Sequence, residues 1–328
     1  MMEQKMFDGK VVLITGGTGS FGKKCVKMLF QNYHPEKVII FSRDELKQHE
    51  MRQNFPREWA IRYFLGDVRD RDRLYRAFVD VDVVIHAAAL KQVPAAEYNP
   101  FEAVKTNIIG AQNVIDAAID RGVSRVIALS TDKAANPVNL YGATKLCSDK
   151  LFVAGNSYVG KDKKSIFSVV RYGNVVGSRG SVVPLFREQR KKGVLSITDA
   201  RMTRFWITLE QAVDFVFKSL EIMEGGEIFV PKLPSMNIMD LARVICPQCE
   251  HEIIGIRPGE KLHEVMIPQD DARRTHEFDT YYVIKSESGY FKGMTLSGKK
   301  VKEDFEYSSG RNEWVLSADE MGTMIEQL

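Results

Sequence analysis

The chain has 328 residues, of which 44% are hydrophobic and 27% are charged, and its formal net charge is +3. These proportions are typical of a soluble globular protein, and the near balance of charge argues against a nucleic-acid partner. No run of about 20 apolar residues predicts a membrane span, and the N-terminal MMEQKMFDGK lacks the apolar core of a signal peptide. Four cysteines do not make a secreted disulfide framework, so we expect a cytoplasmic protein of about two domains.

The first half of the chain alternates short apolar runs with segments of helical periodicity. Strands are predicted at 10–15, 37–41, 61–65, 82–86, 125–130 and 166–171, and helices at 21–32, 44–54, 69–78, 101–121 and 141–158. The apolar residues of these strands are continuous rather than alternating, which is typical of strands covered on both faces. We therefore expect an α/β fold in which residues 1–172 form a Rossmann-like doubly wound parallel sheet.

After residue 172 this alternation stops, and Gly, Pro and charged clusters separate short apolar pieces. One clear helix is predicted, at 209–223, where Thr208 and Gln211 have the spacing of a capping box. We expect residues 173–328 to form mainly a smaller substrate-binding lobe, with some segments returning to the sheet.

Glycines at 16, 19 and 22 follow the first predicted strand, in the segment TGGTGSFG, and a helix begins at once. This spacing allows a tight turn, a close approach of the backbone to a pyrophosphate, and close packing of the helix on the strand. The free N–H groups at the start of the helix would bind the phosphates. We therefore predict a dinucleotide site at Gly16, Gly19 and Gly22.

The end of the second predicted strand bears on the choice between the two nicotinamide dinucleotides. Sites selective for NAD usually place a carboxylate here, where it binds the ribose 2′-hydroxyl. This chain has Ser42 and Arg43 instead, followed by Asp44 and Lys47. Since a hydroxyl and a guanidinium suit a 2′-phosphate, NADP is the preferred prediction, and Asp44 keeps NAD as the alternative.

Two further strand ends face the same predicted site. Asp67 and Val68 follow the third strand, where Asp67 would either bond the adenine amino group or cap the next helix. The fourth strand ends in His86, followed by Ala87 and Ala88, whose small side chains would let a cofactor lie against the backbone. His86 stands inside an apolar run with no carboxylate nearby in sequence, so we expect it to be packed rather than catalytic.

Tyr141 and Lys145 form a Tyr-x-x-x-Lys pair at the start of a predicted helix, one turn apart and so on one face. The same spacing recurs at Tyr33 and at Tyr281, but neither of those pairs falls on a predicted helix. An adjacent ammonium stabilises a phenolate. We therefore predict that Tyr141 takes a proton from a sugar hydroxyl while hydride leaves the same carbon.

These features together resemble the extended short-chain dehydrogenase/reductase family, over at least residues 10–285. Within it, the segment STDKAANPVNLY at 130–141 resembles the inverting UDP-N-acetylglucosamine 4,6-dehydratases of pseudaminic acid synthesis. Three more segments are similar: ALKQVP at 89–94, RYGNVVGSRG at 171–180 and IRPGEK at 256–261. The retaining dTDP-glucose 4,6-dehydratases also resemble this chain, but they carry Glu in place of Lys133, which favours inversion at C5.

The resemblance implies a reaction on UDP-N-acetylglucosamine in three parts. Oxidation at C4, with Tyr141 as base, gives a ketone that acidifies the C5 proton. Water is then eliminated across C5–C6, with Asp132 as the acid for the 6-hydroxyl and Lys133 as the base for C5. Asp132 must be buried enough to hold a proton, and Lys133 needs a partly dry, cationic site that lowers its pKa. Hydride finally returns to C6, so NADP would stay bound and be regenerated in each cycle.

The resemblance also implies which residues contact the ligands. For the cofactor these are Gly16, Gly19, Ser20, Phe21, Gly22, Ser42, Arg43, Asp44, Lys47, Asp67, Val68, Ala87, Ala88, Lys91, Leu129, Ser130, Tyr141 and Lys145. For the UDP-sugar they are Lys91, Thr131, Lys133, Asn174, Val175, Arg179, Val182, Thr198, Arg204, Arg257 and Glu260. We expect no metal and no nucleic acid. The helices predicted at 101–121 and 141–158 commonly pair between subunits in this family, so we expect a homo-oligomer, a dimer or a hexamer.

The segment CPQC at 246–249 admits several interpretations. With His251 it offers three zinc ligands at cramped spacing, and no second Cys pair completes the site. A redox pair is a further alternative. We predict buried or merely tolerated thiols at Cys246 and Cys249.

Two other functions stay open. A nucleotide-sugar 4-epimerase would share Tyr141 and Lys145 but has no need of an acid and a base at Asp132 and Lys133. A regulatory protein that only senses NADP(H) would have no need of the Tyr–Lys pair, so the presence of Tyr141 and Lys145 argues against this function.

Overall fold

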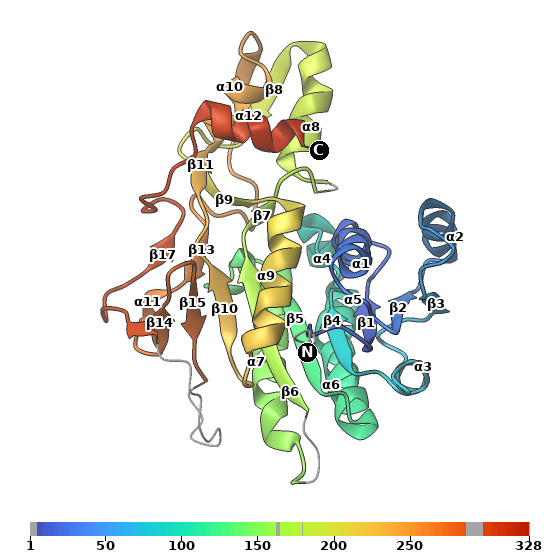
Figure 1. The fold of residues 1–328 in the computed structure, drawn as a ribbon. Coiled ribbons are helices and arrows are strands. Elements are labelled where there is room, and N and C mark those ends of the chain that lie inside the picture. Colours follow the sequence, from blue (N-terminus) through green and yellow to red (C-terminus); the bar gives the residue numbers. More distant parts are fainter. Residues whose placement is uncertain (1–4, 162–164, 179, 287–297, 328) are drawn as a thin grey trace.

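The computed structural model describes residues 5–161, 165–178, 180–286 and 298–327. A ten-stranded sheet runs through the molecule in the order β16-β14-β15-β10-β6-β5-β4-β1-β2-β3 (Figure 1). The seven strands from β10 to β3 are mutually parallel, and β15, β14 and β16 extend the sheet in antiparallel fashion at one edge. The predicted doubly wound α/β fold is confirmed.

The first half of the chain follows the predicted alternation. Its strands are β1 (Val11–Thr15), β2 (Lys37–Ser42), β3 (Ile61–Leu65), β4 (Val83–His86), β5 (Arg125–Thr131) and β6 (Ile166–Tyr172). Its helices are α1 (Ser20–Asn32), α2 (Glu45–Asn54), α3 (Arg71–Ala77), α4 (Val93–Tyr98), α5 (Pro100–Val104), α6 (Gly110–Arg121) and α7 (Leu140–Gly155). The helix predicted at 101–121 is continuous but contains a π-helical turn, Lys105–Ile109, between α5 and α6. Short 3₁₀ turns follow β5 (Asp132–Ala134) and α7 (Asn156–Tyr158).

The second half is richer in helix than the sequence indicated. Its helices are α8 (Val182–Gln189), followed by the 3₁₀ turn Arg190–Lys192, α9 (Leu209–Ile222), α10 (Ile238–Ile245), α11 (Gln269–Ala272) and α12 (Ala318–Glu326). Its strands are β7 (Asn174–Val175), β8 (Val194–Ile197), β9 (Thr203–Ile207), β10 (Ile228–Pro231), β11 (Ser235–Asn237), β12 (Glu250–Ile253), β13 (Val265–Ile267), β14 (Thr275–Glu277), β15 (Tyr281–Ile284), β16 (Lys299–Lys300) and β17 (Tyr307–Ser308). The capping box predicted at Thr208 and Gln211 is present at the start of α9. The expectation of a single helix here is wrong.

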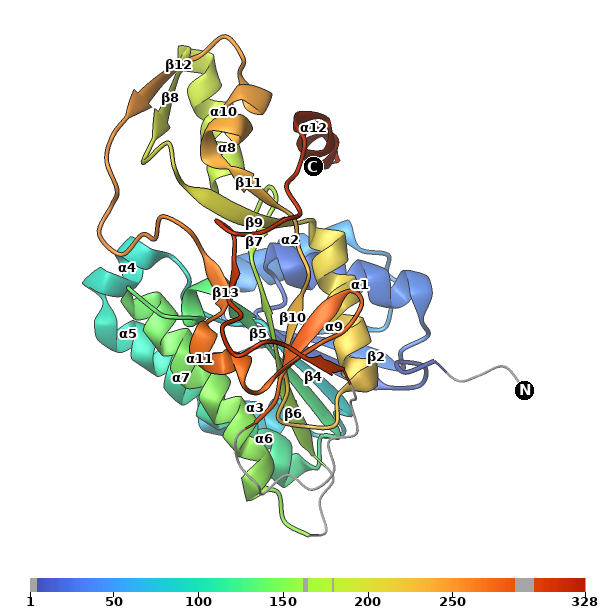
Figure 2. The same ribbon diagram turned by 90° about the vertical axis from the view of Figure 1, so that its left-hand side faces the viewer.

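Helices cover both faces of the sheet. Figure 2 shows α5, α6 and α7 on one side and α1 and α9 on the other, and α1 packs directly against α9. The strands between them are almost wholly buried, as in β1, where every residue is buried. Their continuous apolar runs, such as VVLIT, are therefore explained by burial on two faces.

Two separate clusters of buried apolar side chains stabilise the molecule. The larger one lies around the central sheet, with Leu13, Ile85 and Phe229 among its members. The smaller one lies among α8, α10, α12, β8 and β9, in the upper part of Figure 1, and includes Phe186 and Leu241. In the part of the chain that the structure describes, no helix is both long and apolar enough to cross a membrane.

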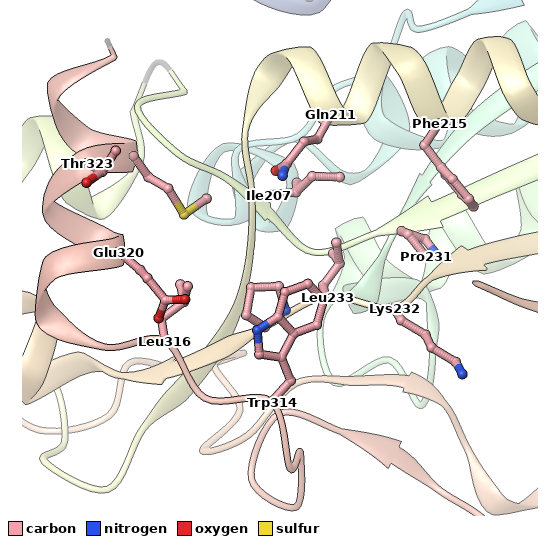
Figure 3. Close-up of a pocket in the computed structure, with 12 residues that line it drawn as sticks. Ile207, Gln211, Phe215, Pro231, Lys232, Leu233, Trp314, Leu316, Glu320 and Thr323 are labelled. Atoms are coloured by element: carbon pink, nitrogen blue, oxygen red, sulfur yellow. The ribbon is translucent and has the colours of Figure 1, made fainter. Parts of the chain in front are cut away.

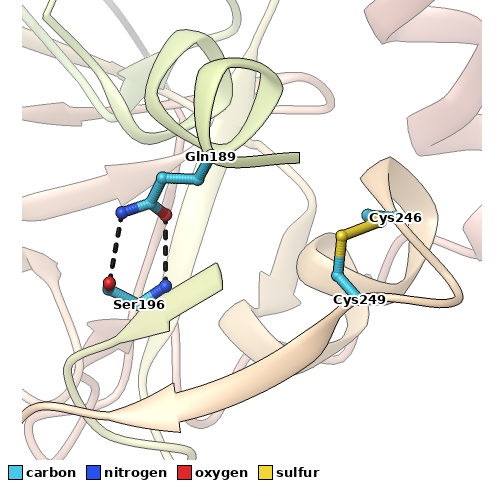
Figure 4. Close-up of a disulfide and its surroundings, with 4 residues drawn as sticks. All are labelled: Gln189, Ser196, Cys246 and Cys249. Atoms are coloured by element: carbon cyan, nitrogen blue, oxygen red, sulfur yellow. Dashed lines mark hydrogen bonds between the residues drawn. A yellow bond between two sulfur atoms is a disulfide. The ribbon is translucent and has the colours of Figure 1, made fainter. Parts of the chain in front are cut away.

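Cys246 and Cys249 are joined in a disulfide, which corrects the prediction of unlinked thiols (Figure 4). Cys246 ends α10 and Cys249 precedes β12, and this turn brings their Cα atoms to 5.4 Å, within the range that a disulfide requires. The bond engages both sulfurs that the zinc alternative needs. Nearby, Gln189 on α8 exchanges two hydrogen bonds with Ser196 on β8, at 3.1 and 3.2 Å, which fixes these elements to each other.

Candidate active site

The backbone of the glycine-rich turn between β1 and α1 lies close to the backbone of neighbouring segments. Gly16 has φ +66°, and a Cβ there would lie 2.9 Å from the backbone of Ala88. A Cβ on Gly22 would lie 2.2 Å from the carbonyl oxygen of Gly17, so only glycine lets α1 pack this closely on the turn. Gly19 is the N-cap of α1 and no side chain caps it, which leaves N–H groups available to an anion.

A cavity of about 930 Å³ extends from this turn across the carboxyl ends of the parallel strands. Of the predicted site residues, it is lined by Gly16, Gly19, Ser20, Phe21, Ser42, Arg43, Asp44, Lys47, Asp67, Val68, Ala87, Ala88, Lys91, Leu129, Ser130, Thr131, Lys133, Tyr141, Lys145, Asn174 and Val175. All predicted cofactor residues except Gly22 therefore line one continuous space. Of the predicted catalytic residues, Lys133, Tyr141 and Lys145 line it, and the buried Asp132 does not. In doubly wound folds ligands bind at this edge of the sheet.

Other predicted residues do not line the cavity. Gly22 lies behind the glycine turn, and Val182 and Thr198 lie in the region of the smaller apolar cluster. Arg204 donates to the carbonyl oxygens of Thr203, Lys261 and Leu262. Arg257 and Glu260 face each other, with 4.0 Å between Nη1 and Oε1, on an exposed loop. Arg179 falls outside the described residues. Ligand contacts for this group stay predictions.

At the far end of the cavity, the carboxylate of Asp44 is already engaged. It caps α2 by accepting from the backbone N–H of Lys47 at 3.0 Å, and it pairs with Lys47 Nζ. These bonds lower the pKa of Asp44. Arg43 is more than half exposed and lies beside Ser42, whose hydroxyl accepts from Gln48 at 3.1 Å. Arg43 and Asp44 both line the cavity, and the Arg43 guanidinium lies 3.8 Å from the carboxylate of Asp67.

Asp67 lies next to Arg43 and does not cap the following helix. Asp70 is the N-cap of α3, and Asp67 instead accepts three kinds of hydrogen bond from Arg69, through the backbone N–H, Nε and Nη2. Burial opposes ionisation, but these bonds outweigh it and lower the pKa of Asp67. The capping alternative for Asp67 is wrong, and its contact with adenine stays a prediction.

His86 is packed, as predicted. Its side chain is 1% exposed, and Nδ1 shares a hydrogen bond of 2.8 Å with the Thr15 hydroxyl. Burial, aided by the nearby charge of Lys145, lowers the pKa of His86 to about 3, so the ring is neutral near pH 7.

Tyr141 and Lys145 face the cavity from the first turns of α7. Asn139 caps this helix by accepting from the N–H of Gly142 at 2.7 Å. Burial raises the pKa of Tyr141 to about 12, while the Lys133 charge and a hydrogen bond with Thr131 act in the opposite direction. Burial also lowers the pKa of Lys145, which its neighbour Asp149 opposes. The cation that acts most on Tyr141 is therefore Lys133, and not Lys145 as the sequence indicated.

Asp132 and Lys133 follow the end of β5 directly, in a single 3₁₀ turn. Asp132 is 1% exposed, and its Oδ1 lies 3.1 Å from Lys133 Nζ. Glu264 reaches the same ammonium at 3.2 Å. Burial alone would lower the pKa of Lys133, but the two carboxylates outweigh it and raise this pKa well above its usual range. The lowered pKa that Lys133 was expected to need is not found, because the two carboxylates in contact with it outweigh both burial and the nearby charge of Arg204.

Two contributors to this geometry were missed from the sequence. Glu264 lies in the loop before β13, far from Lys133 along the chain, and no motif marks it. Gly142 is the second: a Cβ there would lie 2.1 Å from the carbonyl oxygen of Lys133. The glycine after Tyr141 therefore lets α7 start against the Asp132–Lys133 turn, and the sequence YGATK contained that signal.

A second cavity, of about 410 Å³, lies between α9, the β10–β11 connection and α12 (Figure 3). It is mainly apolar, with Phe215, Leu233 and Trp314 in its wall. Its polar groups serve the fold: Gln211 and Glu320 complete the capping boxes of α9 and α12. The larger cavity is therefore the candidate active site.

Comparison with known proteins gives a consistent result. A family model described as "Polysaccharide biosynthesis protein" matches residues 12–286. A "UDP-N-acetylglucosamine 4,6-dehydratase (inverting)" from Campylobacter jejuni is 59% identical, over 98% of this chain and 98% of its own. A "UDP-glucose 4-epimerase" from Rickettsia bellii is 41% identical, over 93% of this chain and 92% of its own.

Solved structures share the fold. That of Pen from Bacillus thuringiensis has a TM-score of 0.88 and 38% identity, over 98% of both chains. That of DesIV, a dTDP-glucose 4,6-dehydratase from Streptomyces venezuelae with NAD and TYD bound, has a TM-score of 0.67 and 22% identity, over 77% of this chain and 86% of that one.

Proposed function

The chain belongs to the polysaccharide biosynthesis protein family, of the extended short-chain dehydrogenase/reductase type, and we propose that it is an inverting UDP-N-acetylglucosamine 4,6-dehydratase. One observation carries the proposal. Lys133, Tyr141 and Lys145 line one cavity together with the glycine turn, and the buried Asp132 pairs with Lys133 at 3.1 Å. A candidate acid, two candidate bases and a candidate dinucleotide site are therefore gathered at one cavity. The product would be UDP-2-acetamido-2,6-dideoxy-β-L-arabino-hexos-4-ulose.

The residues present fit a nicotinamide dinucleotide, and NADP is the cofactor that we propose. The uncapped start of α1 would bind the pyrophosphate, and a Cβ at Gly16 would block that approach. Arg43 is more than half exposed and would bind a 2′-phosphate in addition to its 3.8 Å contact with Asp67, whereas Asp44 caps α2. The bound nicotinamide would supply hydride acceptance from C4 and hydride return to C6, so no cofactor would be consumed.

Tyr141 would remove the proton from the sugar 4-hydroxyl. Its high pKa means that the phenol holds its proton before ligands bind, so its activation depends on nearby positive charge and hydrogen bonding. Lys133 and Thr131 supply both in the structure. Lys145 lies one turn away on the same helix face as Tyr141, and it would bind hydroxyl groups of the sugar and the cofactor.

Asp132 and Lys133 would then eliminate water. As an ion pair they are a carboxylate and an ammonium, the reverse of the acid and base that the step needs. One proton moved from Nζ to Oδ1 across their 3.1 Å contact corrects this, because it breaks one N–H bond, forms one O–H bond, and leaves a neutral amine beside a carboxylic acid. The amine then takes the C5 proton and the acid protonates the departing 6-hydroxyl, which restores the ion pair.

Inversion requires the new C5 proton to arrive on the face opposite to Lys133. Tyr141 has gained a proton during C4 oxidation and is our candidate for this donor. The Lys133 side chain is 26% exposed, and it faces the same cavity as Tyr141, so both groups can address one ring.

The biological setting extends the proposal. The reaction would be the first step of pseudaminic acid synthesis, for flagellin or another surface glycan, in the cytoplasm. Lys91, Asn174 and Val175 line the cavity and are our proposed contacts of the sugar, and Arg204, Arg257 and Glu260 stay predicted contacts of the nucleotide end. The proposed homo-oligomer, a dimer or a hexamer, would use the face of α5, α6 and α7, on which Phe101 is 78% exposed.

A nucleotide-sugar 4-epimerase is the second candidate, because the Rickettsia bellii relative at 41% identity carries that name. An epimerase would use Tyr141 and Lys145 and would leave Asp132 and Lys133 without a step. The test is incubation of the purified protein with UDP-N-acetylglucosamine and no added cofactor. A product that has lost one water, seen by mass spectrometry, supports the dehydratase; a product of unchanged mass supports the epimerase, and no turnover leaves only a binding protein.

A further inference from the structure

Glu264 is a buried carboxylate beside the reacting groups. It is 2% exposed, and its Oε1 lies 3.2 Å from Lys133 Nζ, while Asp132 Oδ1 lies 3.1 Å from the same nitrogen. The Lys133 ammonium is therefore held between two carboxylates that come from distant parts of the chain. The proposed reaction assigns work to only one of them.

The backbone of Glu264 is fixed from the other side. Its N–H donates to the Ser309 hydroxyl at 2.9 Å, and its carbonyl oxygen accepts from the Ser309 N–H at 2.8 Å. The Ser309 hydroxyl in turn contacts Thr203 on β9. These contacts place the side chain without using its carboxylate, and Oε2 is buried and accepts no hydrogen bond from the described residues.

The charges that face Lys133 come from several elements. Asp132 and Glu264 are the anions in contact with it. The cations are Arg204, whose Nε lies 3.9 Å from Glu264 Oε1, and Lys261, whose Nζ lies 4.0 Å from Oε2. Tyr141 is a further titratable neighbour. Burying a carboxylate is costly unless it is paired, and the contact of 3.2 Å with Lys133 is the shortest ion pair of Glu264 among the described residues. Its charge therefore acts most strongly on a group of the reaction site.

We propose that Glu264 is a positioning residue of the elimination step, which holds Lys133 Nζ against Asp132 and stabilises the ammonium that forms when Lys133 takes the C5 proton. The proposal rests on the dehydratase function above. Throughout the step the C5–H bond breaks as an N–H bond forms on Lys133, and the O–H bond of Asp132 breaks as water leaves C6. Glu264 keeps its negative charge from beginning to end, so no further reactant is required.

The test follows absorbance of the reduced nicotinamide after rapid mixing with UDP-N-acetylglucosamine. Its rise reports C4 oxidation by Tyr141, and its decay reports hydride return after elimination. In Glu264→Gln we expect the decay to slow at least about tenfold while the rise changes less than about twofold. Glu264→Asp keeps the charge and should recover part of the decay rate. Asp270→Asn, which removes an exposed carboxylate of α11, is the matched control and should behave as the wild type.

A pH series separates positioning from a loss of structure. Removing a negative charge 3.2 Å from Nζ lowers the pKa of Lys133, so the proton shared with Asp132 is lost at lower pH. The alkaline fall of the decay rate should therefore move down by about one pH unit or more in Glu264→Gln, and should stay in place in Glu264→Asp.

Three results would overturn the proposal: a decay in Glu264→Gln as fast as in the wild type, a slowing by one factor at every pH, or a decay in Glu264→Asp as slow as in Glu264→Gln. If Glu264→Gln does not fold, Glu264→Asp replaces it in the test. The absorbance of reduced nicotinamide should then decay more slowly than in the wild type, while its rise is unchanged. A wild-type protein that forms no dehydrated product would refute the dehydratase function itself, which is a different outcome.

Discussion

At the scale of single residues, Arg43 carries the choice of cofactor. Its guanidinium is more than half exposed at the cavity, and its nearest carboxylate, Asp67, is 3.8 Å away and engaged by Arg69. A contact between Arg and phosphate is worth about 1.5–3 kcal/mol, so Arg43→Ala should weaken NADP binding by about ten- to a hundredfold. NAD binding should change far less, and Arg43→Lys should retain part of the preference. Equal losses for both dinucleotides in calorimetry would show that Arg43 does not read the 2′-phosphate.

Tyr141 carries the first chemical step. Tyr141→Phe removes one hydroxyl from the start of α7 and leaves the Asn139 cap intact, so the fold should persist. We expect no absorbance of reduced nicotinamide on mixing with UDP-N-acetylglucosamine, because the 4-hydroxyl keeps its proton. Such a proton transfer is worth roughly 10²–10⁴-fold, so a variant that keeps more than about a tenth of the wild-type rate would place the base elsewhere.

His86 makes stability depend on pH without taking part in catalysis. Its pKa is about 3 in the folded protein against 6.5 as its ordinary value, so the unfolded chain binds the extra proton between these limits. Stability from neutral His86 is fully present above about pH 6.5 and is lost as pH falls toward 3. Between about pH 7.5 and pH 5.5 the free energy of unfolding should fall roughly 1.4 kcal/mol more in the wild type than in His86→Gln, as measured with denaturant. Equal losses would mean that the ring is protonated in the folded state.

At the scale of elements, the first half of the fold was predictable, whereas in the second half only the helix α9 was predicted. The strands β1 to β6 are covered on both faces, and strands buried in this way have continuous apolar runs that can be recognised in the sequence. The helices α8, α10 and α12 have only eight or nine residues each, too few for a clear helical period. One local signal was available: Ser317 and Glu320 form a capping box at the start of α12.

The junction of α7 with the turn after β5 gives a prediction at this scale. A Cβ on Gly142 would lie 2.1 Å from the Lys133 carbonyl oxygen, so Gly142→Ala must displace either the helix or the turn. Because misplacement by about 1 Å can cost about a hundredfold in rate, we expect dehydration to slow by at least about tenfold. Gly160→Ala is the control, since nothing lies within 4 Å of its added Cβ. Equal rates for the two variants would show that this junction does not set the geometry.

At the scale of the whole molecule, the candidate active site depends on contacts between residues that are far apart in the sequence, and the sequence alone does not reveal these contacts. Tyr141 and Lys145 were found from their spacing at the start of a helix that follows a strand end, and Asp132 and Lys133 from the resemblance of the segment 130–141. Glu264 meets Lys133 only because the second half of the chain returns beside β5, and nothing local marks that return. A lowered pKa was expected for Lys133 because cationic surroundings were expected, whereas its sequence neighbour Asp132 and the distant Glu264 both act on it. These two carboxylates raise this pKa instead.

The loop that carries Arg257 and Glu260 is also positioned by a contact between residues far apart in the sequence. Asn139 joins this loop to the start of α7, through a hydrogen bond of 2.7 Å to the carbonyl oxygen of Gly259. The resemblance implied that this loop lies near the substrate, and Asn139, which bonds it, is two residues before Tyr141. Its side chains nevertheless face each other outside the cavity, which only three-dimensional packing decides.

Inversion at C5 by Lys133 can be tested through the stereochemistry of the first product. The wild type is incubated with UDP-N-acetylglucosamine in D₂O, and proton NMR is recorded before the product rearranges. We expect coupling constants of an L-arabino ring, deuterium at C5, and the original C4 hydrogen at C6. Lys133→Ala should form some reduced nicotinamide and fail to lose water. A D-xylo ring as the first and only product would contradict inversion, and with it the role given to Lys133.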